Sequence, residues 1–429
     1  MFATISNTEL QKTTSYKLVL PFYIYAALSF LVACILLLLN TNIIHEHYFQ
    51  PQTLAITHLM ALGWGTMIIL GASHQLLPVL IEGKLDSEPL AYLSFGFAAI
   101  GIPFLVIGFY IFHLGWILQT GAVLINIAVV CYLSNVIASI YESKKYDVHA
   151  WFITFASLWL FATTFFGLLL VFNFTRSLLP DNSIAYLSIH AHMGLAGWFL
   201  LLVLGVASRL IPMFLISKYT SNVTLWWIFG LINVGLMCFI LLKTFDVSPT
   251  QFYKPFFLVF IALALFGRYC YKAYQIRIRK QVDQQMKVSL LSVALLLLPL
   301  ISLLVVLSFL TIEVKTTMVM LYGFCIFFGW LTAIIFGMTF KTLPFIVWNK
   351  VYHQKASAGK TPAPKELFSE SIFKGMSVAY LAGFVIFIIG IILLNNLLLK
   401  TGAVFLLMTA ILYVWNVGIT LSHRPKRTD

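Results

Sequence analysis

Long apolar runs separated by short polar connections fill almost the whole chain. A helix that crosses a bilayer needs about 20 mostly apolar residues, and twelve segments meet this requirement. They are residues 18–40, 54–80, 90–112, 115–141, 149–173, 185–215, 222–243, 253–275, 286–310, 316–347, 372–394 and 399–422. The pattern predicts an all-α, polytopic membrane protein with twelve transmembrane helices, surrounded by the lipid bilayer.

The charge distribution predicts the orientation of the chain. The 429 residues are 61% hydrophobic and 10% charged, whereas soluble chains carry roughly 25% charged residues. A net charge of +13 could indicate a nucleic-acid partner, but with a cytoplasmic N-terminus all but five of the 27 Lys and Arg lie on the inner side. Cytoplasmic loops of membrane proteins collect these residues. We therefore expect no nucleic-acid partner, a bacterial inner-membrane location and two cytoplasmic termini. Residues 1–17 lack the pattern of a cleaved signal, so the first helix is expected to stay.

Three of the predicted spans share a sequence pattern. Counted from His58, His192 and Phe324, a Gly-Trp pair follows at five and six residues, a glycine at thirteen and a proline at twenty. The glycines are expected to let neighbouring helices approach closely, and the tryptophans are assigned no chemistry. Because these are the second, sixth and tenth spans, the repeat predicts three pseudo-equivalent four-helix arcs. The arcs comprise residues 18–141, 149–275 and 286–422, with a cytoplasmic linker at 349–374 in the third and a cytoplasmic tail at 423–429.

Position seventeen of the repeat carries Gln75, Arg209 and Lys341. Two of these side chains are cations close to the cytoplasmic end of their helices. One interpretation is that they extend to the inner headgroups. The other is that they pair with an anionic group, such as a carboxylate of a cofactor.

Six of the ten histidines are predicted at the outer membrane surface. His58 and His192 occupy the same repeat position, and neutral imidazole is a common ligand of haem iron and copper. His190 lies two residues before His192, so the two rings should point about 200° apart on a helix and share an ion only if the helix frays. His74 is expected near the inner boundary.

These segments resemble a known family. Twelve spans in three arcs, with "THLMALGWGTMIILGASHQLLP" in the second and "IHAHMGLAGW" in the sixth, look like catalytic subunit I of the haem-copper oxidases and the related nitric oxide reductases. The resemblance implies that His58 matches a ligand of the low-spin haem and that His190 or His192 matches a copper ligand. Residues 222–243 and 316–347 contain no histidine, so the family's histidines of spans seven and ten are absent. In span ten, Tyr322 and Phe324 occupy the repeat positions of His190 and His192. A proton-pumping terminal oxidase is therefore not expected.

A divergent branch of that family fits the sequence better. In topology and histidine content the chain is also similar to the NnrS membrane proteins of bacterial nitric oxide stress. The first hypothesis is a haem-binding protein for electron transfer or for oxygen or nitric oxide chemistry, an oxidoreductase if it is an enzyme. His58 and His192 would be axial ligands, and an electron-donor partner subunit could complete the missing ligands.

Two further hypotheses stay open. One is a copper-binding or copper-transporting protein that uses His45, His47, His190 and His192 with Met60 or Met193, since paired imidazoles and thioethers suit copper. The other is a cofactor-free small-solute carrier or assembly partner. The scarcity of charge inside the spans speaks against ion transport, so the cargo would be apolar or gaseous.

Overall fold

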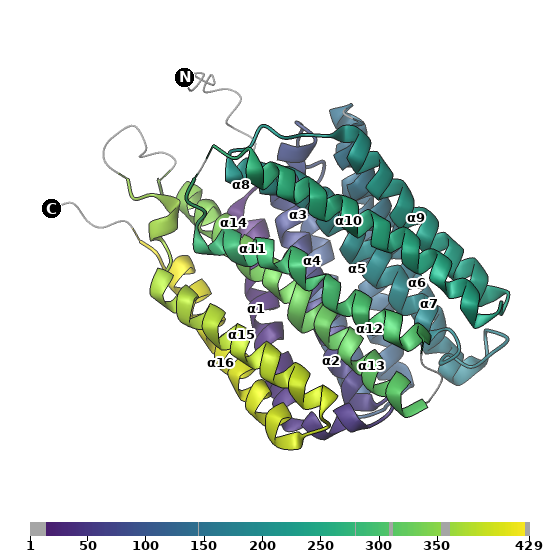
Figure 1. Cartoon of the computed structure of the whole chain (residues 1–429). Coiled ribbons are helices and arrows are strands. Elements are labelled where there is room, and N and C mark those ends of the chain that lie inside the picture. The colour runs from purple at the N-terminus through teal and green to yellow at the C-terminus, as the bar shows by residue number, and fades with distance from the viewer. Residues whose placement is uncertain (1–13, 145, 279, 309–311, 353–360, 425–429) are drawn as a thin grey trace.

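The computed structural model describes residues 14–424 except 145, 279, 309–311 and 353–360. Within these residues the regular elements are helices, and no strand occurs. Twelve helical stretches are long and apolar enough to cross a membrane, so the chain is a multi-pass membrane protein, as predicted. Figure 1 shows these helices running roughly side by side, with the α15/α16 pair and the α9/α10 pair at opposite edges.

The helix bounds agree with the predicted spans to within a few residues, except where noted below. The first four spans are α1 (Tyr16–Leu39), the continuous segment α2 (Pro51–His58), η2 (Leu59–Thr66) and α3 (Met67–Leu80), α4 (Glu88–Tyr110), and α5 (Trp116–Ser143). The next four are α6 (Val148–Arg176), the continuous segment α7 (Leu187–His192), η3 (Met193–Leu200) and α8 (Leu201–Leu215), α9 (Asn222–Thr244), and η4 (Pro249–Phe252) with α10 (Tyr253–Gln275). The last four are α11 (Gln284–Leu295) with α12 (Leu297–Ser308), the continuous segment α13 (Ile312–Phe324), η5 (Cys325–Leu331) and α14 (Thr332–Tyr352), α15 (Glu370–Ile392), and α16 (Asn396–Leu421).

The connections between spans are short. Two of them contain the 3-10 helices η1 (Thr41–His45) and η7 (Pro364–Glu366). Helix α14 continues to Tyr352, so the predicted linker at 349–374 starts too early. Residues 353–360 of that linker, 1–13 of the N-terminal segment and 425–429 of the tail lie outside the described residues.

Several spans begin at a polar residue that caps the helix. The side chains of Ser87, Asp147, Asp283 and Ser369 each accept a hydrogen bond from a backbone N–H three residues further on. Such caps satisfy donors that the first turn of a helix cannot pair. They define where α4, α6, α11 and α15 start.

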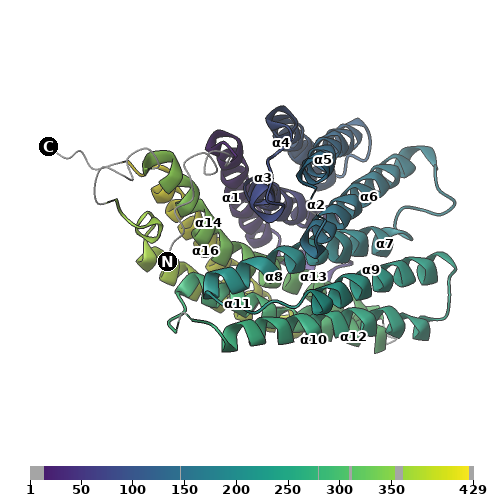
Figure 2. The same ribbon diagram turned by 90° about the horizontal axis from the view of Figure 1, so that it is seen from above.

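The three spans of the sequence repeat form the interior of the bundle. In their most apolar stretches 72%, 72% and 78% of the residues are buried, against 50% or less in the other nine spans. Viewed from above, α3 and α8 lie between the α4/α5 pair on one side and α10 and α12 on the other (Figure 2). The arrangement of the remaining spans as three equivalent arcs stays a prediction.

Close helix packing explains the glycines at position thirteen of the repeat. A Cβ atom on Gly71, Gly205 or Gly337 would come closer than 3.0 Å to a residue of the preceding span. The facing residues are Phe22 of α1 and Phe152 of α6 for the first two glycines. Each repeated span therefore packs on the first span of its own unit through a glycine, as the sequence predicts.

Candidate functional site

Each repeated span changes from α-helical to π-helical geometry directly after the residue that starts the repeat. Segment η2 follows His58, η3 follows His192 and η5 follows Phe324. π-helical turns are rare and often occur at functional sites. The repeat in the sequence gave no sign of this π-helical geometry. The three π-helical segments begin at the same position of the repeat.

The tryptophans of the repeat connect these three π-helical segments. The indole Nε1 of Trp64 donates a hydrogen bond to Thr332 Oγ1 at 3.1 Å, and Trp198 Nε1 donates to Thr66 Oγ1 at the same distance. In the third copy the equivalent acceptor position is Leu200, which has no hydroxyl. We call these contacts the Trp–Thr layer. It ties the second span to both the sixth and the tenth.

His58 and His192 adopt the same local geometry on one side of the Trp–Thr layer. Nδ1 of His58 lies 2.7 Å from the carbonyl oxygen of Leu54, and Nδ1 of His192 lies 2.8 Å from that of Ser188. A carbonyl can only accept, so the proton resides on Nδ1 in each ring. The neutral rings therefore keep their lone pair on Nε2, the arrangement typical of histidines that ligate a metal.

Each of these histidines faces an aromatic ring from the next copy of the repeat. The His58 and His190 rings lie 6.4 Å apart between centroids at 23°, and those of His192 and Tyr322 lie 6.0 Å apart at 23°. The Tyr322 hydroxyl is 3.5 Å from His192 Nε2. Because His190 and Tyr322 occupy the same repeat position, the same pair of positions is in contact between the first and second copies and between the second and third copies.

His190 and His192 belong to the same short helix and turn toward different neighbours. His190 faces His58, whereas His192 packs against Phe239 with ring centroids 4.5 Å apart. The His190 ring is buried and has a backbone hydrogen-bond partner in Thr163. The helix does not fray here, so the two imidazoles do not converge on one point.

The third copy of the repeat has an aromatic cluster where the second has histidines. Phe324 stacks on Phe328, Phe384 and Phe387 with centroid distances of 5.1, 5.6 and 4.4 Å. This packing fills the position with hydrocarbon. It offers no donor atom for a metal.

Two other histidines that the sequence predicts at the outer surface have protein contacts of their own. His45 Nε2 is 2.8 Å from Asn396 Oδ1, and His47 Nδ1 accepts from the Phe49 N–H at 3.1 Å. Met60 and Met193 are buried. Within the part of the chain that the structure describes, no group of three or more His, Cys, Asp or Glu residues is placed to hold a metal ion.

His74 lies on the other side of the Trp–Thr layer and is fully buried. Neither ring nitrogen has a hydrogen-bond partner. The imidazole contacts the rings of Phe22 and Tyr132, with centroids 5.4 and 5.7 Å away. A buried polar group without partners is uncommon, and the sequence gave no indication of this environment.

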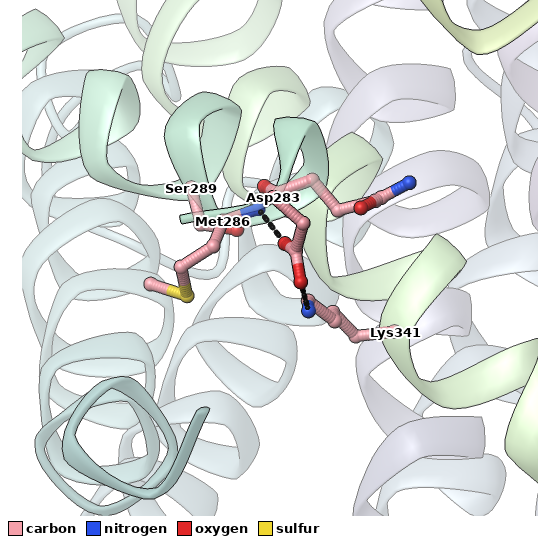
Figure 3. Close-up of polar contacts among 5 residues, drawn as sticks. Asp283, Met286, Ser289 and Lys341 are labelled. Carbon is pink, nitrogen blue, oxygen red and sulfur yellow. Dashed lines mark hydrogen bonds and ion pairs between the residues drawn. The ribbon is translucent and has the colours of Figure 1, made fainter. Parts of the chain in front are cut away.

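The two cations at position seventeen differ in their surroundings. Lys341 forms an ion pair with Asp283, whose other carboxylate oxygen accepts from the Met286 N–H at 3.1 Å (Figure 3). The Lys341 ammonium also lies 5.3 Å from the centre of the Phe214 ring. Arg209, by contrast, is exposed. The anionic partner of Lys341 is thus a residue of the chain itself.

Taken together, these features define a multi-pass α-helical membrane protein in which two of the three central spans carry histidines on one side of a Trp–Thr layer. Comparison of the chain with protein-family models and with curated proteins finds no match.

Proposed function

We propose that this protein binds haem in the bacterial inner membrane, with both termini in the cytoplasm, on a scaffold related to haem-copper oxidase subunit I. Its role is electron transfer or the handling of oxygen or nitric oxide, with an electron-donor partner subunit. One observation carries the proposal. His58 and His192 hold the same repeat position with Nδ1 fixed on a carbonyl, which leaves the ring lone pair on Nε2; in His192 this nitrogen lies 3.5 Å from the Tyr322 hydroxyl.

The chemistry of the donor set fits a haem. His58 and His190 present two imidazoles to each other, and imidazole is a usual axial ligand of haem iron. The His190 ring is buried beside the backbone of Thr163, which supplies a hydrogen-bond partner that orients it. When bound, the haem iron would supply reversible electron transfer if both imidazoles ligate it, and a site for a diatomic gas if only one of them does.

Neighbouring residues position these imidazoles. Gly167 of α6 leaves the room that the His190 ring occupies, because a Cβ there would lie 2.8 Å from the ring carbon Cε1. Phe109 stacks on His58 with centroids 4.6 Å apart. The bond from His58 Nδ1 to Leu54 raises the basicity of Nε2 and fixes the ring orientation.

The aromatic cluster around Phe324 limits the proposal. In the family that the sequence resembles, the tenth span supplies histidines for both haems, whereas here Phe324 is packed among three other phenylalanine rings. A proton-pumping terminal oxidase is therefore not proposed. The cofactor is held from the second and sixth spans.

Haem and copper content separate the two metal-based functions. We would express the full chain with adequate haem supply, purify it from membranes and measure haem and copper per chain. The proposal predicts haem in the wild type, loss of haem in His58→Ala and no change in His45→Ala. Bound copper without haem, reduced by replacing both His45 and His190, would support the copper-binding function instead. A stable protein free of both would favour a cofactor-free carrier.

A further inference from the structure

A partly open cavity of about 110 Å³ lies among the three repeated spans, on the opposite side of the Trp–Thr layer from His58 and His192. Positions 10, 11, 14, 15 and 18 of the repeat line it in all three copies. Position 10, for example, contributes Ile68, Leu202 and Ile334. The cavity is therefore built by equivalent residues of three helices.

The spacing of these positions shows that one helix face forms the wall. Residues separated by one, four, five and eight positions share a face of a helix, so α3, α8 and α14 turn the same face inward. No charged residue lines the cavity. Small side chains at positions 14 and 15, namely Ala72, Ser73 and Ala207, leave the space open. The cavity thus follows from the repeat and not from one local packing defect.

The few polar groups of the wall are mostly engaged with other protein groups. The hydroxyls of Tyr23 and Thr342 bond to each other at 2.9 Å, and Thr339 Oγ1 lies 3.1 Å from the hydroxyl of Tyr413. The Tyr132 hydroxyl has the side chains of Ser73 and Ser157 as its polar neighbours, and Ser73 also lines the cavity. A buried water needs two to four polar partners, and apolar cavities stay dry. The wall therefore favours an apolar occupant.

We propose that this cavity is a second binding site that takes one small, uncharged, apolar molecule of the size of a dissolved gas. An apolar cavity of about 150 Å³ accepts benzene or xenon, so a space of about 110 Å³ accepts xenon or a diatomic gas. The site lies beyond the Trp–Thr layer from the histidines and does not depend on the proposed haem.

Xenon is the probe for this site. Crystals of the full chain, pressurised with xenon, should show an anomalous peak between α3, α8 and α14. Ala207→Leu, which fills the cavity, should remove that peak, and Ala72→Leu provides a second filling variant if the first does not fold. Ala162→Leu is the matched control, because Ala162 lines an open groove between α6 and α9 instead.

Removing the Tyr132 hydroxyl distinguishes an apolar occupant from water. With an apolar occupant, Tyr132→Phe keeps the xenon peak at equal or higher occupancy. The proposal would be overturned by wild-type crystals that take up xenon elsewhere but not here, by ordered water that fills the cavity under xenon pressure, or by an unchanged peak in both filling variants.

Discussion

The ion pair between Lys341 and Asp283 allows the energetics of the bundle to be tested quantitatively. Lys341 comes from the tenth span, and Asp283 caps the ninth span through its contact with the Met286 N–H. Their side chains are 12% and 26% exposed. Replacing Lys341 by Gln removes the ammonium group from beside a carboxylate that is mostly shielded from water.

The expected cost lies between the two limits for ion pairs. Loss of one partner from a fully buried pair costs about 3–5 kcal/mol, and an exposed pair contributes roughly 0–1 kcal/mol. With about a fifth of the pair exposed on average, we expect Lys341→Gln to lower the free energy of unfolding by about 2–3 kcal/mol. The pair of Lys374 and Glu370 is 58% and 63% exposed, so Lys374→Gln should cost less than about 0.5 kcal/mol.

A double-mutant cycle measures the interaction itself. Asp283→Asn keeps a good helix cap, so Lys341→Gln, Asp283→Asn and the double variant isolate the charge pair in unfolding measurements in nanodiscs. The coupling energy should reach about 1.5 kcal/mol or more. A coupling as small as that of Lys374 with Glu370 would refute the reasoning, because it would mean that the pair is fully solvated.

Three further predictions follow from the surroundings of single residues. His74→Leu should raise the free energy of unfolding by about 1 kcal/mol, since it removes two buried nitrogens that lack partners; a loss of stability would instead reveal a bound partner of the imidazole. Gly167→Ala should displace the His190 ring and weaken haem retention by roughly fivefold, or about 1 kcal/mol, whereas Gly230→Ala, which meets open space, should have no such effect on haem content. Arg209→Gln should leave the haem spectrum and stability unchanged, because an exposed cation contributes little. A lost Soret band in the folded variant would mean that the haem lies near Arg209, at the opposite end of the bundle from His58.

The number and position of the spans could be predicted because each apolar run is a local property of the sequence. The close approach at Gly71 and Gly205 was also predictable, since equal spacing in several segments indicates equal packing. These features depend on residues within one helix or on its direct repeat.

Contacts between distant segments could not be predicted in the same way. Trp64 bonds to Thr332, 268 residues further along the chain, and Lys341 of the tenth span pairs with Asp283 at the start of the ninth. The facing of His58 and His190 depends on how two helices rotate against each other, and helix periodicity does not fix that rotation. The π-helical segments likewise have no known sequence signature in the repeat.

The optical spectrum of the purified protein tests haem ligation by His58 most directly. We predict a Soret band in the reduced-minus-oxidised spectrum of the wild type, its loss or shift in His58→Ala, and its recovery when imidazole is added to that variant. His45→Ala should match the wild type, because His45 contacts Asn396 away from the proposed site. The absence of a Soret band in wild-type protein expressed with adequate haem, or an unchanged band in His58→Ala, would contradict the proposal.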